Sequence, residues 1–235
     1  MRNSITNSKR KVYATPRISL KMLCEYVNAS PSRRSTIIKN SCEVPVFIAR
    51  RYNLANEIIT SYLTDNKNSI DWLNSEISRI LSQSFRSENE KDMALLSAEA
   101  VTAFSKDAKS ISKIFEAFVL EAVDQMASYK LTLETVDVSI KPDLLLKDEN
   151  GNIIGFIKLY FSKETELNQN TADLITCLGR EYFKEMMNLN LLERNCLVLD
   201  VFRGELYSAP KSFKKRMSDI YASCREIADR WVRFI

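Results

Sequence analysis

The sequence predicts an α/β (α+β) protein in which a helical region precedes a unit of mixed helices and strands. Residues 1–105 carry repeated helix signals and no strand signal. Residues 130–163 contain apolar runs on both sides of an Asn-Gly turn, the strongest short-range hairpin signal. Residues 196–202 form a continuous apolar run of the kind found in buried strands. With 235 residues available, we expect a basic helical region at 1–105 and a second unit at 106–235.

The first unit is expected to be entirely helical because its apolar side chains recur at helical spacing. Residues 1–17 are polar and basic and predict a flexible arm. Ser30-Pro31 is typical of a helix start, with serine as the N-cap and proline at the first helical position. The expected helices are 19–28, a short one after Pro31, one ending near Leu63, and those at 69–82 and 88–104.

The second unit is expected to begin with a helix at 110–129, because Ile111, Phe115 and Phe118 belong to an apolar stripe of period 3.6. The remaining expected elements are strands at 131–140, 142–147 and 153–161, a helix at 171–187, strands at 196–202 and 205–208, and a last helix after Pro210. The turn between the second and third of these strands is residues 148–152, D-E-N-G-N.

Composition excludes several classes of site. The chain has no histidine, which excludes Ser-His-Asp and Cys-His nucleophiles and histidine-bound zinc. Its 4 glycines include no phosphate-binding loop motif. The 5 cysteines lack CxxC spacing, so we expect reduced core thiols and a cytoplasmic protein. No apolar run of about 18 residues predicts a membrane span, and no secretory signal is recognisable.

Charge is distributed unevenly along the chain. Residues 1–51 carry 11 Lys and Arg against 2 Asp and Glu, a net charge of +9, whereas the rest carry 23 against 28, a net of −5. Such a basic segment is typical of nucleic-acid binding, although a solvated basic tail is the alternative. The candidate contacts lie in three clusters: Arg33 and Arg34, Arg50 and Arg51, and Lys214 and Lys215.

One pair of residues predicts chemistry. Asp143 follows Pro142 at the start of one expected strand, and Lys158 lies within the next, between two apolar neighbours. A lysine in an apolar strand is either half-exposed or directed at a carboxylate, so we expect the two side chains to meet at one end of the sheet. The alternative for Asp143 is a turn residue that hydrogen-bonds nearby backbone.

The order of helix, three strands, helix and strand over residues 110–202, with Pro142-Asp143 opening the second strand and Lys158 in the third, resembles the PD-(D/E)XK nuclease superfamily. The likeness covers a little over a third of the chain. It implies a restriction-endonuclease-like α-β-β-β-α-β core, Asp143 as a ligand of Mg²⁺ or Mn²⁺, and Lys158 as the group that positions or activates water. The segments S-R-R, I-I-G-F-I-K-L-Y-F-S-K and C-R-E-I-A-D-R-W are also similar to uncharacterised bacterial proteins, which implies no function.

The family pattern places an acid two residues before the lysine, where this chain has Phe156. In parts of the superfamily the first helix supplies a glutamate, so the resemblance implies Glu121 as the substitute ligand beside Asp143. A plain surface acid is the alternative for Glu121.

Two functions follow as expectations, and a protein-interaction component without nucleic acid is left open as a third. The first is a Mg²⁺-dependent nuclease with a degenerate site formed by Asp143, Lys158 and Glu121. The second is a catalytically inactive, nuclease-like DNA-binding or scaffold subunit of a bacterial complex, and the loss of the acid at Phe156 favours it. DNA is the favoured partner, no membrane is expected, and a homodimer or a larger complex is left open.

Overall fold

The structure is a computed structural model that describes residues 10–45, 51–65, 69–124, 127–164 and 166–235. Its helices are α1 (Leu20–Asn28), α2 (Pro31–Cys42), α3 (Asn53–Thr64), α4 (Ile70–Leu81), α5 (Glu88–Ser105), α6 (Ala108–Phe115), α7 (Gln169–Met187) and α8 (Lys214–Trp231), with a 3-10 turn, η1 (Glu193–Asn195). Its strands are β1 (Arg10–Val12), β2 (Arg17–Ser19), β3 (Glu43–Pro45), β4 (Val119–Ala122), β5 (Lys130–Leu133), β6 (Val136–Ser139), β7 (Leu144–Lys147), β8 (Ile153–Tyr160), β9 (Cys196–Asp200) and β10 (Glu205–Ser208).

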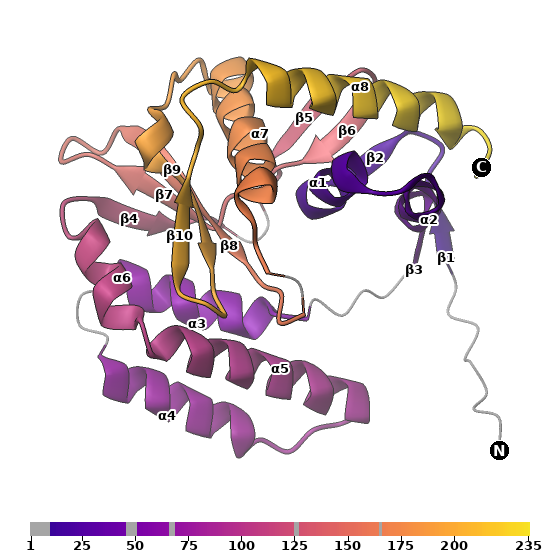
Figure 1. Cartoon of the computed structure of the whole chain (residues 1–235). Coiled ribbons are helices and arrows are strands. Elements are labelled where there is room, and N and C mark those ends of the chain that lie inside the picture. The colour runs from indigo at the N-terminus through magenta and orange to yellow at the C-terminus, as the bar shows by residue number, and fades with distance from the viewer. Residues whose placement is uncertain (1–9, 46–50, 66–68, 125–126, 165) are drawn as a thin grey trace, which may run out of the picture.

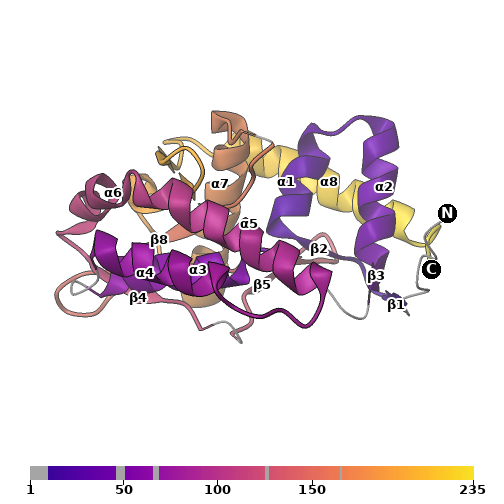
Figure 2. The same cartoon turned by 90° about the horizontal axis from the view of Figure 1, so that it is seen from below.

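A five-stranded mixed sheet organises the molecule, with the strand order β10-β9-β8-β7-β4. Neighbouring strands are antiparallel except β8 and β9, which are parallel and are connected through α7. Two apolar cores form because side chains alternate across the strands. Leu145, Phe156 and Val198 face the core that contains α1, α7 and α8. The alternating neighbours on these strands face the core that contains α3 to α6. Figures 1 and 2 show how the helices are arranged about the sheet.

A second sheet connects the beginning of the chain to its middle. Its order is β2-β6-β5, and β2 pairs in parallel with β6. A further pair, β1 with β3, lies beside α2. The expectation of an entirely helical N-terminal region is therefore wrong, because three short strands lie among its helices. Each has only three residues, too few for an alternating pattern to be recognised.

The first strand of the predicted core is also different. Residues 130–139 form a hairpin of β5 and β6 in the second sheet, and its turn residues Glu134 and Thr135 have φ values of 46° and 68°. The place beside β7 is occupied instead by β4, which pairs with it antiparallel.

The predicted helix at 110–129 correspondingly ends at Phe115 in α6. Its apolar stripe continues into β4, because a short apolar run fits both helical and strand spacing. The backbone groups of β4 are paired by the edge of β7, a partner that local sequence does not specify.

Other expectations are confirmed. The hairpin of β7 and β8 turns at residues 148–152, where Gly151 has a φ of 81° and the Asp148 carboxylate accepts hydrogen bonds from the N–H groups of Asn150 and Asn152. Helices α5, α7 and α8 and strand β9 lie where their patterns predict them. Among the described helices, none combines the length and apolarity that crossing a bilayer requires.

Candidate functional site

The carboxylate of Asp143 and the ammonium of Lys158 form an ion pair of 3.0 Å. Asp143 is 8% exposed and lies where the chain enters β7. Its Oδ2 also accepts the backbone N–H of Leu159 at 2.7 Å, and its Oδ1 accepts the side-chain amide of Asn56 at 2.8 Å. The predicted meeting of Asp143 and Lys158 at one end of the sheet is thus present, and α3 contributes a partner through Asn56.

Backbone pairing positions both groups. The N–H of Asp143 donates to the carbonyl of Ile157 at 3.0 Å, and the carbonyl of Asp143 accepts the N–H of Val123 at 3.0 Å. These bonds extend the β4-β7-β8 ladder by one residue, so the Asp143 backbone is rigid. Lys158 belongs to β8, and its stem lines a small apolar void beside Phe156 and α7.

The residues present do not fit a Mg²⁺ or Mn²⁺ site. Both carboxylate oxygens of Asp143 are already occupied: Oδ1 accepts from Asn56, and Oδ2 accepts from the N–H of Leu159 and pairs with Lys158. Glu121 is on β4 rather than on a helix, is half exposed, and pairs with Lys147 of β7. Within the described ranges, no three Asp, Glu, Cys or His side chains gather closely enough to hold a metal ion. Hard cations of this kind need several oxygen ligands, which this arrangement does not supply.

Phe156 has a structural role at the position of the missing acid. Its side chain is 2% exposed and stacks on Phe183 of α7, with ring centroids 5.5 Å apart. A Cβ placed on Gly179 would lie 2.2 Å from the Phe156 ring, so α7 approaches the sheet there closely enough to require glycine. This face of β8 is therefore covered by packed helix.

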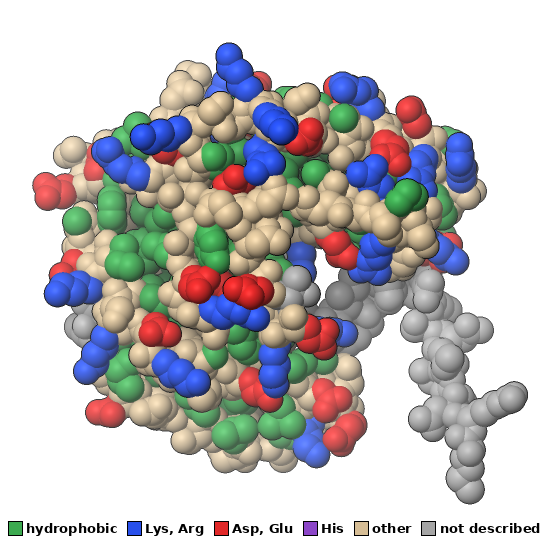
Figure 3. All heavy atoms as spheres, in the orientation of Figure 1, with side chains coloured by type: hydrophobic (Ala, Val, Ile, Leu, Met, Phe, Trp, Pro, Cys, Tyr) green, Lys and Arg blue, Asp and Glu red, His purple; other side chains and the backbone are tan. Residues whose placement is uncertain are grey.

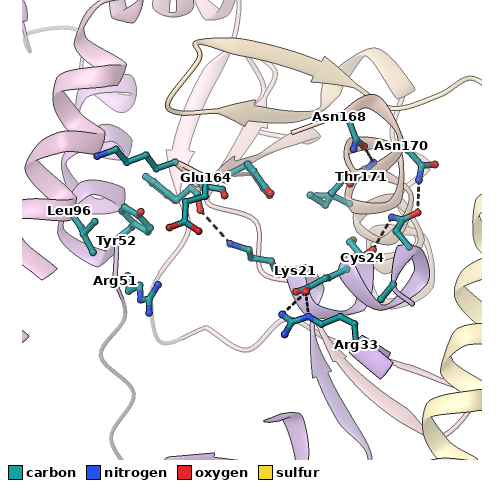
Figure 4. A pocket seen from close by; sticks show the side chains of 18 residues that line it. Lys21, Cys24, Arg33, Arg51, Tyr52, Leu96, Glu164, Asn168, Asn170 and Thr171 are labelled. Atoms are coloured by element: carbon teal, nitrogen blue, oxygen red, sulfur yellow. Dashed lines mark hydrogen bonds and ion pairs between the residues drawn. The ribbon is translucent and has the colours of Figure 1, made fainter. Parts of the chain in front are cut away.

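Two adjoining cavities lie beside the ion pair. The smaller, of about 230 Å³, contains Asp143, Lys158 and Lys141. The larger, of about 960 Å³, lies between α1, α2, the start of α3 and the loop after β8. Arg51, Tyr52 and Phe161 line both. We call the two cavities together the cleft; its larger part is drawn in Figure 4, and Figure 3 shows a notch between the α1–α2 and α3–α5 parts of the surface.

Basic side chains line the cleft, and only some of them are neutralised by local acids. Arg33 pairs with Glu25 at 2.6 Å, and Lys163 pairs with Glu99 at 2.9 Å. In the part of the chain that the structure describes, no carboxylate lies within ion-pair distance of Lys21 or Arg51. In the larger cavity, Lys21 and Arg51 are therefore two cations that form no ion pair within the described residues, although the acids Glu25 and Glu164 also line it.

Burial within the cleft lowers the pKa of Lys21. The nearby charge of Glu25 opposes this shift, while the nearby charge of Arg51 adds to it. The ammonium of Lys21 reaches only the carbonyl of Phe161, at 3.5 Å. Figure 4 shows Lys21 pointing from α1 across the cleft, with Arg51 and Tyr52 approaching from the other side.

The other predicted basic residues are dispersed. Arg34 connects elements: it pairs with Glu226 of α8 at 2.8 Å and donates to the carbonyls of Tyr26 and Val27. Lys214 and Lys215 are exposed at the start of α8 and are not among the residues that line the cleft. Arg50 lies outside the described residues. Of the six, Arg33 and Arg51 are brought together at the cleft.

Local patterns do not identify Lys21 as a cleft residue, because the other cleft surfaces come from distant parts of the chain, such as the start of α3 and Phe161, 140 positions later. Asp200 is also missed. It is fully buried at the end of β9, where it accepts the N–H groups of Leu167 and Phe202 and pairs with Arg203. These bonds hold the loop that forms one wall of the cleft. The signal in the sequence is a carboxylate at the end of an apolar strand, because a buried carboxylate needs hydrogen-bond donors from the neighbouring backbone.

The cysteines are buried thiols, and one of them, Cys24, lies in the wall of the larger cavity. All five are free and buried, as expected for core thiols. Burial raises the pKa of Cys177, Cys196 and Cys224 to about 12. We therefore expect a thiol-reactive disulfide reagent to label none of them in the native protein at neutral pH, and all five after denaturation, as counted by absorbance. Rapid labelling of the native protein would contradict this.

Comparison with known proteins does not define the site: no protein-family model matches the chain, and no curated protein matches it.

Proposed function

We propose that the protein is a nucleic-acid-binding module built on a restriction-endonuclease-like core, and that it does not hydrolyse phosphodiesters. The observation that carries this proposal is that the Asp143 carboxylate already has three partners, namely Lys158, Asn56 and the N–H of Leu159. The cleft beside it contains cations that form no ion pair among the described residues. A carboxylate held in this way serves as a structural anchor for the sheet end, and the cations remain available for phosphates.

The order of elements supports the core assignment. An antiparallel meander of β4, β7 and β8 is followed by α7 and then by β9 parallel to β8. Asp143 precedes the second strand of this meander and Lys158 lies in the third, as in the PD-(D/E)XK pattern. Phe156 occupies the position of the acid in that pattern, and no metal-ligand group gathers among the described residues, so the likeness supports a binding role better than a catalytic one.

Electrostatics supports binding. The cleft is lined by Lys21, Arg33, Arg51, Lys141, Lys158 and Lys163, against the acids Glu25, Asp143 and Glu164 and the partner of Lys163, Glu99. This excess of positive charge attracts a polyanion, and its release of counterions makes affinity depend on salt.

The test measures binding and cleavage separately. Fluorescence anisotropy with labelled DNA, with RNA as a second arm, is recorded over a range of salt concentrations in EDTA. We expect the logarithm of the binding constant to fall linearly with the logarithm of salt concentration, and binding to need no Mg²⁺. No cleavage is expected with Mg²⁺ or Mn²⁺.

Two results would contradict the proposal. Absence of binding to DNA and RNA at low salt would exclude a nucleic-acid-binding module. Metal-dependent cleavage that is lost in Asp143→Asn would instead identify a working nuclease.

A further inference from the structure

We propose that the cleft holds a single-stranded stretch of nucleic acid, with a phosphate between Lys21 and Arg51 and a base against the ring pair of Tyr52 and Phe161. This inference rests on the proposed function and specifies its ligand and its contact residues. It concerns the junction of the two cavities, where Arg51, Tyr52 and Phe161 are shared.

The phosphate position follows from two facing cations. Lys21 belongs to α1 and Arg51 precedes α3, and the positive charge of Arg51 is close enough to disfavour the charged form of Lys21. The ammonium of Lys21 has one weak acceptor, the carbonyl of Phe161 at 3.5 Å. An anion between the two groups supplies charge-assisted hydrogen bonds to both and relieves their mutual repulsion.

The base position follows from the aromatic pair. The rings of Tyr52 and Phe161 are stacked, with centroids 5.1 Å apart and planes 11° apart, and Phe202 supports Tyr52 edge-on at 6.0 Å. Both stacked residues are half-buried. Aromatic rings beside cations in a groove are typical of single-strand binding, in which bases stack on side chains and the backbone follows the charge.

This arrangement selects against a duplex. Stacking on protein rings requires bases that are not already paired and stacked with one another. The larger cavity of about 960 Å³ is comparable to the volume of sites that enclose small ligands, and the cavity of about 230 Å³ extends it towards Asp143 and Lys158. An extended single strand fits such a cleft because its unstacked nucleotides can enter one at a time.

The experiment uses the full chain and anisotropy with an unstructured oligothymidylate, an unstructured oligouridylate and a blunt DNA duplex of the same length. We expect single strands to bind at least about tenfold more tightly than the duplex. Lys21→Gln and Arg51→Gln should each weaken single-strand binding about tenfold and reduce the salt slope by about 0.7.

Two further variants separate stacking from charge. Tyr52→Leu keeps an apolar side chain but removes the ring, so single-strand binding should weaken about tenfold with the salt slope unchanged. Lys113→Gln, an exposed lysine of α6 that does not line the cleft, is the matched control and should bind like the wild type. Melting temperatures identify any variant that has lost its fold. If Lys21→Gln or Tyr52→Leu is unfolded, the conservative variant Lys21→Arg or Tyr52→Phe is measured in its place and should bind like the wild type.

The outcomes distinguish the inference from the proposed function. The single-strand site would be overturned if the duplex bound as tightly as the single strands or more tightly. It would also be overturned if folded Lys21→Gln and Tyr52→Leu variants bound like Lys113→Gln. In both cases the nucleic-acid-binding function would stand. Absence of binding to all three ligands by the wild type would overturn both.

Discussion

Replacing Phe156 by glutamate, an acid that the PD-(D/E)XK pattern accepts two residues before the lysine, should lower the free energy of unfolding by about 5 kcal/mol without creating a metal site. The aromatic side chain is fully packed between β8 and α7, against Phe183 and over Gly179. The variant loses this packing and must also bury a carboxyl group beside Lys158, whose ammonium already pairs with Asp143. Urea denaturation followed by circular dichroism measures the loss, and calorimetry with Mn²⁺ measures metal binding.

Val119→Glu provides the matched control. It introduces the same carboxylate into the same sheet, but at a position of β4 that is 55% exposed, so its effect should stay within about 0.5 kcal/mol. A Phe156→Glu variant with wild-type stability and measurable Mn²⁺ affinity would show that this face of β8 opens and that the nuclease pattern is functional.

Removing the carboxylate of Asp143 should also be costly. Asp143→Ala leaves the ammonium of Lys158 without its partner and the N–H of Leu159 without its acceptor, in a place where Asp143 is 8% exposed. Loss of one member of such a pair typically costs about 3–5 kcal/mol, and we expect about 3 kcal/mol because Lys158 retains some access to water. Chemical denaturation measures this loss.

The double variant Asp143→Ala/Lys158→Met tests the cause. Because it removes the unpaired charge as well, it should be more stable than Asp143→Ala alone. The pair of Glu121 and Lys147, in which the carboxylate is 54% exposed, is the control, and Glu121→Ala should cost less than about 1 kcal/mol. Equal losses in Asp143→Ala and Glu121→Ala would mean that the buried pair does not stabilise the end of the sheet.

Sequence patterns predict the elements whose signals are local. The Asn-Gly turn of the β7–β8 hairpin, the apolar run of β9 and the periodic stripes of α5, α7 and α8 are contained within their own segments. The meeting of Asp143 and Lys158 was also predictable, because the hairpin places their strands side by side. The exact register was not, because an irregularity between Leu146 and Lys147 shifts it so that Leu144 stands opposite Ile157. The backbone requirements of a hairpin are met within a few residues, so short-range chemistry determines them.

Elements that depend on distant partners were not predictable. Val119 to Ala122 is apolar enough for a helix or a strand, and its place in β4 is decided by the unpaired edge of β7. The three strands among the N-terminal helices likewise exist because β2 meets β6 and β1 meets β3. Glu121 was therefore expected on a helix beside Asp143 and instead lies on the edge strand with Lys147.

By itself, the sequence predicted the mixed α/β class, the central hairpin and the meeting of one carboxylate with one lysine. Tertiary structure decided that Asn56 and the backbone N–H of Leu159 donate hydrogen bonds to the carboxylate of this pair, and that Phe156 belongs to the core. It also decided that Lys21 and Arg51 line one cleft. The physical reason is that hydrogen-bond saturation, close helix packing and convergence of charge depend on residues far apart in the chain, whose meeting only the folded chain specifies.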